Sequence, residues 1–272
     1  MNDVVLYRQG NQLQKRDITN LLNEYSSKIK WKKDKIRVLD IGCGDGSATA
    51  MLKEFIPSDS TLVGCDINEK MVNHANTHHR NEQISFMVLD IEGVVPENLK
   101  GSFDHVFSFF TLQWIMNQER AFTNIYDLLS ARGDCFIIFV AYAPVLDVYR
   151  ILARSSKWST WLHPSDRYSK LPYSEFKEPE KVISQMMERI GFADIEVECR
   201  EFTYVYENME IAKIALKSIC PYKIPAELYN DFMDDYIEAT KDVDMFNIIS
   251  DGHTDTLEHR YGLYVLHARK PT

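Results

Sequence analysis

Three glycines, Gly42, Gly44 and Gly46, lie in the segment LDIGCGDG directly after a short apolar run. Glycine adopts backbone conformations that other residues avoid, and it lets a ligand approach the main chain without interference from a Cβ atom. A dinucleotide-binding GxGxxG loop would need a third glycine at position 47, which is Ser47. The spacing is GxGxG, and no Lys-Ser or Lys-Thr pair ends it, so the loop is not a phosphate-cradling Walker loop either.

Three aspartates accompany the glycines. Asp40 precedes them, Asp66 follows a second apolar run, and Asp90 follows a third in LDI. A carboxylate at the position of Asp66 can accept from both ribose hydroxyls of a nucleoside. Asp90 can accept from an adenine amino group while Ile91 packs on the ring, and Asp40 suits a ligand ammonium, directly or through water. Asp40 or Asp66 taken alone could instead cap the following helix. Together the acids and glycines indicate a nucleoside cofactor.

These side chains need strands and helices to position them. Apolar β-branched runs predict five strands, at 36–42, 61–67, 84–91, 103–110 and 134–142. Helical patterns separate them, at 47–55, 69–79 and 118–130, and Arg132-Gly133 is predicted to end the last of these helices. The second half predicts a helix at 179–191, a strand at 193–206 and a last strand at 261–270. Continuous apolar strands alternating with helices predict an α/β fold, with a parallel sheet covered on both faces.

Two aromatic-rich insertions, residues 143–178 and about 205–258, complete the chain, and the second contains helical patterns at 209–219 and 226–242. Neither a repeat nor a low-complexity linker separates them from the rest. We therefore expect one domain over 1–272, with a cofactor-binding core at about 36–142 and a helical, aromatic cap. Five aromatic residues either wall a pocket or belong to the core: Phe109, Phe110, Tyr142, Trp158 and Trp161.

The composition limits the kinds of partner. The chain has 272 residues and a net charge of −9, which argues against nucleic acid because such binding relies on a basic face. Its five cysteines form no CxxC pair and no metal-ligand spacing, so we expect a reducing compartment and no metal site. The sequence has no signal-peptide pattern and no apolar run near the roughly 18 to 20 residues of a membrane span. A cytoplasmic protein is the expectation.

The GxGxG turn with Asp66 and Asp90 resembles the Rossmann-like class I methyltransferases that use S-adenosylmethionine. The resemblance implies a mainly parallel seven-stranded sheet with an antiparallel last strand and helices on both faces. It also implies S-adenosylmethionine as cofactor and S-adenosylhomocysteine as product. The residues expected to bind the cofactor are Asp40, Gly42, Gly44, Gly46, Asp66, Ile67, Asp90, Ile91 and Ser108.

The segment after the fourth strand, SFFTLQW, bears on the methyl acceptor. Enzymes that methylate amino groups of nucleic-acid bases tend to carry Asn/Asp-Pro-Pro-aromatic there, so this segment favours an apolar or carboxylic small molecule. Together with YRQGNQLQKRD, WKKDKIRVLDIGCGDG, FDHVFSFFTLQWIMNQERAF and CREFTYVYE, it is similar to the insect juvenile hormone acid methyltransferases. That family commonly has His at the position of Gln113, which leaves the exact substrate open.

The family resemblance implies methyl transfer to the carboxylate of farnesoic acid or juvenile hormone acid, giving the methyl ester in juvenile hormone biosynthesis. In the mechanistically similar plant carboxyl methyltransferases a Gln and a Trp hold the carboxylate, and the matching positions are Gln14 and Trp114. Gln14 could instead be a solvated helix residue beside Lys15 and Arg16. Two other functions stay open: a methyltransferase of fatty or other small acids, and a non-catalytic cofactor-binding paralog. A homodimer is also open.

Overall fold

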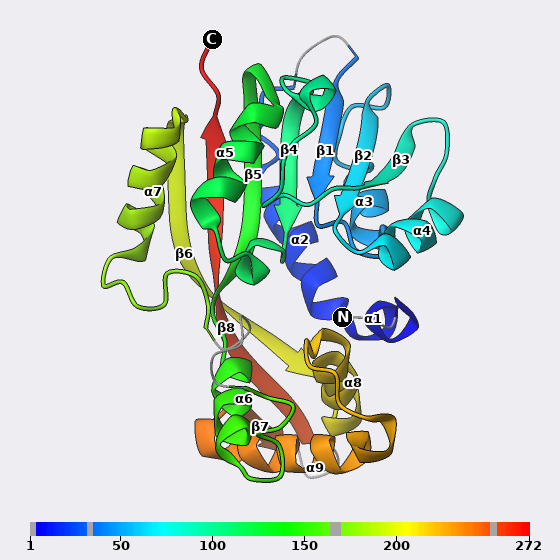
Figure 1. Cartoon of the computed structure of the whole chain (residues 1–272), viewed down its shortest axis with the longest axis vertical. Coiled ribbons are helices and arrows are strands. Elements are labelled where there is room, and N and C mark those ends of the chain that lie inside the picture. The colour runs from blue at the N-terminus through cyan, green and yellow to red at the C-terminus, as the bar shows by residue number, and fades with distance from the viewer. Residues whose placement is uncertain (1–3, 32–34, 164–169, 251–254) are drawn as a thin grey trace. The chain divides into compact units, whose positions relative to one another are not determined.

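The computed structural model describes residues 4–31, 35–163, 170–250 and 255–272. The chain forms two compact units, which we describe separately (Figure 1). The sheet unit comprises Gln14–Phe139, Glu175–Cys199 and Tyr264–Thr272. The helical unit comprises Met1–Leu13, Val140–Ser174 and Arg200–Leu263, and its last two segments overlap the predicted insertions. That the whole chain folds as one domain stays a prediction.

The strands form a sheet in the order β3-β2-β1-β4-β5-β8-β6, with β7 paired to β8. β1 pairs in parallel with β2 and β4, β2 with β3, and β4 with β5, whereas β8 points the opposite way from β1 and β4 (Figure 1). This confirms the predicted α/β fold with an antiparallel last strand. The strands are β1 (Arg37–Ile41), β2 (Thr61–Asp66), β3 (Ile84–Val88), β4 (Phe103–Phe109), β5 (Leu129–Tyr142), β6 (Ala193–Tyr206), β7 (Phe246–Ser250) and β8 (Asp255–Arg269).

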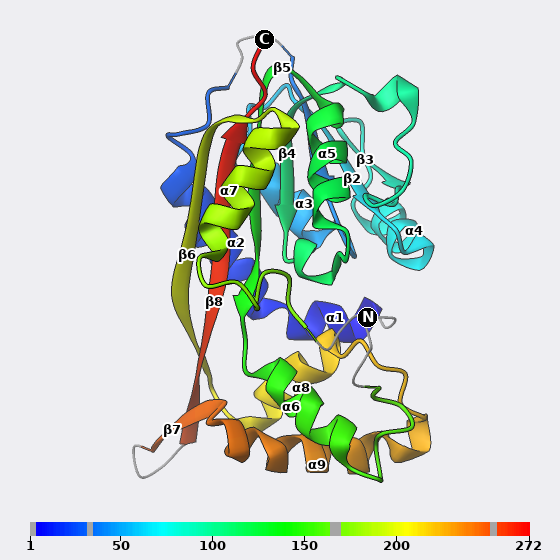
Figure 2. The same cartoon turned by 60° about the vertical axis from the view of Figure 1, so that its left-hand side comes forward.

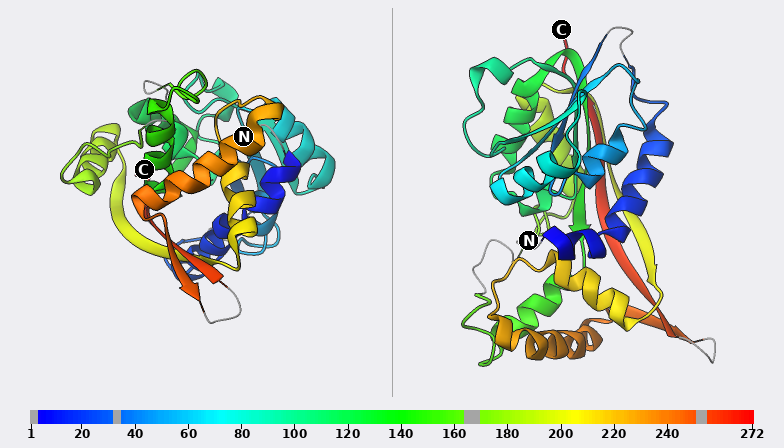
Figure 3. Two further views of the ribbon diagram at one scale, coloured as in Figure 1. Left: turned by 90° about the horizontal axis from the view of Figure 1, so that it is seen from below. Right: turned by 90° about the vertical axis from the view of Figure 1, so that its right-hand side faces the viewer.

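The strands that flank the cofactor residues are apolar because both faces of the sheet are covered. Val38 and Leu39 in β1 and Val106 in β4 are fully buried. Helices α5 (Gln118–Leu128) and α7 (Pro179–Ile190) lie on one face of the sheet, and α2 (Gln12–Tyr25) lies on the other (Figures 1 and 3). Two further helices follow strands of this unit, α3 (Ser47–Leu52) after β1 and α4 (Glu69–His78) after β2.

Several element boundaries differ from the prediction: β8 begins at Asp255 instead of residue 261, and α3 ends at Leu52 instead of residue 55. Two more differences have a visible cause. The third strand ends at Val88 instead of residue 91, because the chain turns at Asp90, whose carbonyl accepts from the N–H of Gly93 at 3.0 Å. β5 begins at Leu129, which pairs with Phe103, instead of at residue 134. The register then shifts, and Arg132 has φ of 65° within the strand. The Arg-Gly pair therefore lies in an irregular stretch of strand and not at a helix end.

The helical unit has its own aromatic core. It contains α1 (Val4–Gly10), α6 (Val145–Arg154), α8 (Met209–Ile219) and α9 (Tyr229–Thr240) (Figure 2). Trp158 is 1% exposed, stands edge-on to Phe232 at 5.2 Å, and donates its indole N–H to Asp235 at 2.7 Å. This places Trp158 in the core of the unit, which was one of its two expected positions. Among the described residues, no helix is both long and apolar enough to cross a bilayer.

Candidate active site

The turn between β1 and α3 requires glycine at all three expected positions. Gly42, Gly44 and Gly46 have φ of 75°, 53° and 82°, in the left-handed region where a Cβ atom is unfavourable. A Cβ on Gly42 would collide with the side chain of Thr111, and one on Gly46 would lie 2.8 Å from the Cβ of Ala75. The N–H of Gly42 donates to the carbonyl of Cys65 at 2.7 Å, which fixes the turn against β2.

Asp66 ends β2 and is bonded to the glycine turn. One carboxylate oxygen accepts from the N–H of Gly44 at 3.0 Å, and the other accepts from the N–H of Asn68 at 2.8 Å. Burial raises the pKa of Asp66, and these two backbone hydrogen bonds oppose the rise. Each carboxylate oxygen has a second lone pair, so the side chain is fixed in place and still able to accept from a pair of hydroxyls.

Asp40 lies below the turn and is almost fully buried, at 1% exposure. Its Oδ2 accepts from the hydroxyl of Thr49 at 2.5 Å. Burial raises the pKa of Asp40 to about 7, the Thr49 hydrogen bond lowers it in part, and the negative charge of Asp66 raises it further. So little exposed surface leaves little room for a direct contact between Asp40 and a ligand, which favours contact through water, the second of the two predicted arrangements.

The segment after β3 forms a turn with one exposed acid. Asp90 is exposed, and its Oδ1 accepts from the N–H of Glu92 at 2.9 Å. Ile91, which was predicted to pack on the ring, is 5% exposed and belongs to the core, while Ile67, next to Asp66, is 66% exposed. Ile67 therefore offers the apolar surface on which a flat ring can pack.

The strand end that carries Ser108 is held by several side chains. Ser108 is fully buried and donates to the carbonyl of Ile41 at 3.0 Å, so its hydroxyl ties β4 to β1. The next turn contains Phe110 in the left-handed region, at φ of 52°. Gln113 donates to the Phe110 carbonyl at 2.6 Å, and the Thr111 hydroxyl lies 3.3 Å from the Gly42 carbonyl. The turn after β4 is therefore braced against the glycine turn.

Gln14 and Trp114 come from two elements of the sheet unit. Gln14 is in α2 and is partly buried, and its Oε1 is buried without a hydrogen-bond partner among the described residues. Trp114 ends the short 3-10 helix η2 (Leu112–Trp114) and is half-buried. A buried polar atom without a partner is uncommon in a folded protein and requires an explanation. Because Oε1 accepts hydrogen bonds, only a ligand that carries a donor group would supply one.

The sequence did not indicate the side chains that hold these turns together. Oε1 of Glu92 accepts from the N–H groups of Met116 and Asn117, at 3.1 and 2.7 Å. Asn124 in α5 donates to the carbonyls of Ile91 and Gly93, at 2.7 and 2.9 Å. These hydrogen bonds join a side chain to a backbone group 24 to 33 residues away in the sequence. Residue spacing along the chain does not predict bonds of this kind.

Comparisons with known proteins agree with this geometry. A family model described as a methyltransferase domain matches residues 39–137. The chain is 45% identical to the juvenile hormone acid O-methyltransferase of Bombyx mori, over 99% of this chain and 98% of that protein. It is 39% identical to the Drosophila melanogaster protein of the same name, over 88% and 82% of the two chains. The chain belongs to the juvenile hormone acid O-methyltransferase family.

Members of this family are S-adenosylmethionine-dependent methyltransferases, so the predicted enzyme class and cofactor are confirmed. Solved structures support the same fold. The YcgJ protein of Bacillus subtilis superposes with a TM-score of 0.59 at 16% identity, over 93% of this chain and 99% of that one. A Haemonchus contortus phosphoethanolamine N-methyltransferase superposes with a TM-score of 0.55 at 18% identity, over 93% and 53% of the two chains.

The residues of this juvenile hormone acid O-methyltransferase family member fit the cofactor. Gly42, Gly44 and Gly46 give the turn its left-handed backbone, and protein side chains fill the space where a Cβ at Gly42 or Gly46 would lie. Asp66 presents two oriented acceptors, as the two hydroxyls of a ribose require. Ile67 offers exposed apolar surface beside it. The residues named for this site offer carboxylates and backbone groups, and none of them is basic. Such a site suits a cationic nucleoside better than a pyrophosphate.

Proposed function

We propose that this protein transfers a methyl group from S-adenosylmethionine to the carboxylate of juvenile hormone acid or farnesoic acid, giving the methyl ester in juvenile hormone biosynthesis. The observation that carries the proposal is the 45% identity with the Bombyx mori juvenile hormone acid O-methyltransferase over 99% of the chain. The glycine turn and the oriented Asp66 carboxylate support it, since both suit the cofactor of that reaction. A location in the cytoplasm and a homodimer stay predictions.

We assign the cofactor contacts as follows. Asp66 accepts from the ribose hydroxyls, and Ile67 packs on the adenine ring, whose amino group donates to Asp90. Asp40 binds the cofactor ammonium through water. The remaining residues of the set hold the site in shape: Gly42, Gly44, Gly46, Ile91 and Ser108. When bound, S-adenosylmethionine supplies a methyl group on a positively charged sulfur.

Gln14 and Trp114 hold the acceptor carboxylate in this proposal. The amide N–H and the indole N–H are donors that bind an anion without transferring a proton to it. The contact with the acid comes from the Nε2 amino group of Gln14, because Oε1, which has no partner among the described residues, is an acceptor and cannot bond a carboxylate. A carboxylic acid with a pKa of about 4 is already ionised near neutral pH, so no general base is required. The protein's task is to align the carboxylate and exclude water from it.

The test is a methyl-transfer assay with labelled cofactor and three acceptors: juvenile hormone acid, farnesoic acid and a saturated fatty acid. We expect ester from the two sesquiterpenoid acids and little from the fatty acid. Equal or greater turnover of the fatty acid would favour a broader small-acid methyltransferase. If none of the acids yields an ester while the cofactor still binds, the protein is a non-catalytic paralog and the proposal fails.

Substitutions test the carboxylate contacts separately. Gln14→Ala and Trp114→Phe should each raise the KM for the acid and leave cofactor affinity unchanged, because each removes a donor to the carboxylate only. Gln185→Ala, at an exposed position of α7, is the matched control and should behave as wild type. Unchanged turnover of the acid in both site variants would remove these residues from the acceptor site.

The ribose contact has its own test. Asp66→Ala should weaken cofactor binding by roughly 1 to 3 kcal/mol, the usual cost of losing a charge-assisted hydrogen bond. Glu188→Ala, also exposed on α7, removes a carboxylate at a position that none of these contacts involves. Calorimetry with S-adenosylhomocysteine measures both variants, and equal affinities would reject the role of Asp66.

A further inference from the structure

Two turns of the sheet unit carry contacts that the proposed function assigns to different ligands. Asp90, in the turn after β3, accepts from the adenine amino group of the cofactor. Trp114, in the turn after β4, donates to the carboxylate of the acceptor acid. Strands β3 and β4 are not neighbours, because β2 and β1 lie between them in the sheet. A side chain that bonds one turn to the other therefore links the two ligands, and Glu92 does this.

Glu92 bridges the two turns with its carboxylate. Its Oε1 accepts from the N–H of Met116 at 3.1 Å and from the N–H of Asn117 at 2.7 Å. Hydrogen bonds from backbone N–H groups to a carboxylate are charge-assisted and are stronger than those between neutral groups. Met116 and Asn117 lie between η2 and α5, so the bridge fixes the segment that follows Trp114.

The turn after β3 orients Asp90 and Glu92 together. Oδ1 of Asp90 accepts from the N–H of Glu92 at 2.9 Å, and the carbonyl of Asp90 accepts from the N–H of Gly93 at 3.0 Å. Asn124 donates to the carbonyls on both sides of Glu92, those of Ile91 and Gly93. Oδ2 of Asp90 is left to accept from the adenine amino group. A ligand on Asp90 therefore stabilises the turn conformation from which Glu92 reaches the second turn.

Further hydrogen bonds connect the end of this bridge to Trp114. Gln118, the first residue of α5, donates through Nε2 to the carbonyl of Leu112 at 2.7 Å and to the carbonyl of Ile115 at 2.9 Å. These two carbonyls lie on either side of Trp114 in the sequence. The backbone that carries the indole is thus bonded to the start of α5, where the bridge from Glu92 also ends.

The bridged segment lies at the surface. Met116 is 66% exposed, and Asn117 is exposed as well. Short exposed segments open locally at a lower cost in free energy than the core does. A ligand that favours the closed form removes part of this cost for a second ligand that needs the same form, so the two ligands then bind cooperatively.

We infer that Glu92 is a positioning residue that transmits cofactor binding from Asp90 to the turn carrying Trp114, so that the acceptor acid binds more tightly once the cofactor is bound. The inference rests on the proposed function for the identity of the two ligands. Because such coupling is reciprocal, the acid also raises the affinity for the cofactor. Glu92 itself touches neither ligand and acts through the two turns.

Hydrogen exchange of the backbone amides of Met116 and Asn117 tests the transmission without any acid or turnover. NMR on the full chain compares the exchange rates with and without saturating S-adenosylhomocysteine. In wild type the ligand should slow both amides about fivefold or more, the lower end of the usual coupling between two sites. The amide of Gly101, which donates to the carbonyl of Asp127 at 2.7 Å outside the bridge, should exchange at the same rate in both samples.

Three variants of the full chain separate the bridge from a general effect. In Glu92→Ala the ligand should leave the exchange rates of the two bridged amides unchanged. Glu92→Gln keeps an oxygen acceptor and should restore most of the slowing. Glu97→Ala is the matched control, because it removes an 84% exposed carboxylate from the same connection between β3 and β4, and it should behave as wild type.

Calorimetry with juvenile hormone acid measures the consequence for the acceptor. Wild type should bind the acid about fivefold or more tightly with S-adenosylhomocysteine than without it. In Glu92→Ala the two affinities should be equal, and in Glu92→Gln most of the difference should return. A residue that only stabilised the fold would change both affinities by the same factor, so their ratio distinguishes transmission from a structural role.

Three results would overturn the inference. The first is unchanged exchange of the Met116 and Asn117 amides in wild type when S-adenosylhomocysteine binds. The second is slowing that persists in Glu92→Ala. The third is a loss of acid affinity in Glu92→Ala that is the same with and without S-adenosylhomocysteine. If the acid does not bind while the exchange responds through Glu92, the transmission to this turn stands and the acceptor of the proposed function is wrong.

Discussion

Asp40 allows one substitution to test both the stability of the fold and the electrostatics of the cofactor site. The carboxylate is 1% exposed and accepts from Thr49 at 2.5 Å. Burial raises the pKa of Asp40 to about 7, from an ordinary value of 3.8. Asp40→Asn keeps the size of the side chain and an oxygen acceptor for Thr49, and it removes the charge. Asp59→Asn, at an exposed position, is the matched control.

The stability effect follows from the direction of the pKa shift. Below pH 3.8 Asp40 is protonated in both the folded and the unfolded chain, so the substitution changes little. Between pH 4 and 7 the folded chain keeps a proton that the unfolded chain releases, so the stability of wild type falls as pH rises through this window. A shift of about three units corresponds to roughly 4 kcal/mol above pH 7. Asp40→Asn should therefore be the more stable protein at pH 8.

Cofactor binding should change in the opposite direction. A ligand ammonium near Asp40 favours the ionised carboxylate, so wild-type affinity for S-adenosylhomocysteine should rise with pH. If the bound-state pKa lies well below 5.5, the rise from pH 5.5 to 7 is roughly fifteenfold. This window stays below the pKa of an α-amino group, about 7.7, so the ligand keeps its own charge. Asp40→Asn should bind more weakly at pH 7 and show no such rise.

Two kinds of measurement, each at two pH values, test the expected changes in stability and in cofactor affinity. Chemical denaturation at pH 4 and pH 8 gives the stability difference, and calorimetry at pH 5.5 and pH 7 gives the affinity. The reasoning is refuted if Asp40→Asn is less stable than wild type at pH 8, or if its affinity rises with pH as steeply as that of wild type. Asp59→Asn should follow wild type in all four measurements.

Three further predictions concern the fold around the site. Gly42→Ala should destabilise the protein more than Gly101→Ala. Both glycines have positive φ, so each alanine adds backbone strain of about 1 to 3 kcal/mol, but only at Gly42 would the new Cβ also collide with a neighbour. Equal losses of unfolding free energy in the two variants would contradict this. His105→Ala should cost roughly 3 kcal/mol, because the buried Asp134 carboxylate loses the imidazole 2.6 Å away and keeps only His267, at 3.8 Å. Adding Asp134→Asn should restore part of the loss. Despite burial, the neighbouring histidines hold the pKa of Asp134 below its usual value, so the stability from this pair is present at neutral pH and is lost as the pH falls through that lowered pKa. Gln113→Leu should raise the KM for the acid and leave cofactor affinity unchanged, because the Phe110 carbonyl loses its donor and the turn after β4 loosens. Gln113→His keeps a donor and should preserve the KM. Equal KM values for the two variants would contradict a role of this hydrogen bond.

The local pattern of the sequence was enough to place several elements. The strand Ala193–Tyr206 and the helix Met209–Ile219 begin and end where alternation and helical spacing put them. The glycine turn and the position of Asp66 at the end of β2 were also predicted. A tight turn and a strand end each favour particular residue types within a few positions, so the sequence indicates them directly. What such patterns record is periodicity and turn chemistry within one segment.

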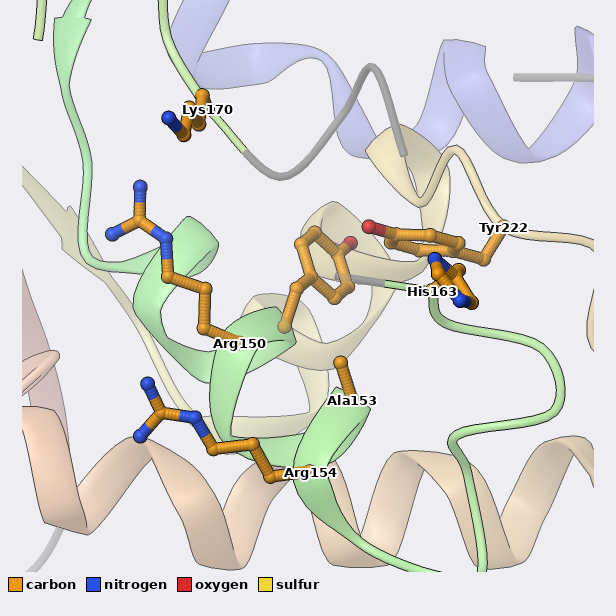
Figure 4. Close-up of a pocket in the computed structure, with 7 residues that line it drawn as sticks. Arg150, Ala153, Arg154, His163, Lys170 and Tyr222 are labelled. Atoms are coloured by element: carbon orange, nitrogen blue, oxygen red, sulfur yellow. The ribbon is translucent and has the colours of Figure 1, made fainter. Parts of the chain in front are cut away.

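Contacts between segments far apart in sequence required the tertiary structure. Thr111 reaches Gly42 across 69 residues, and Glu92 holds the backbone at Asn117. A cavity in the helical unit likewise brings Arg150 and Tyr222 together from two distant segments (Figure 4). Strand pairing decided the start of β5 at Leu129, where the local Arg-Gly signal had predicted a helix end.

The buried position of Asp40 shows the difference most clearly. Its residue type and its place before the glycines followed from the sequence alone. Its exposure of 1% and its pKa of about 7 depend on the packing around it and on the charge of Asp66, and both come from the fold. The sequence by itself determined which chemical groups stand at the ends of the strands. Only the tertiary structure decided their environment, because burial and charge are set by neighbours that are distant along the chain.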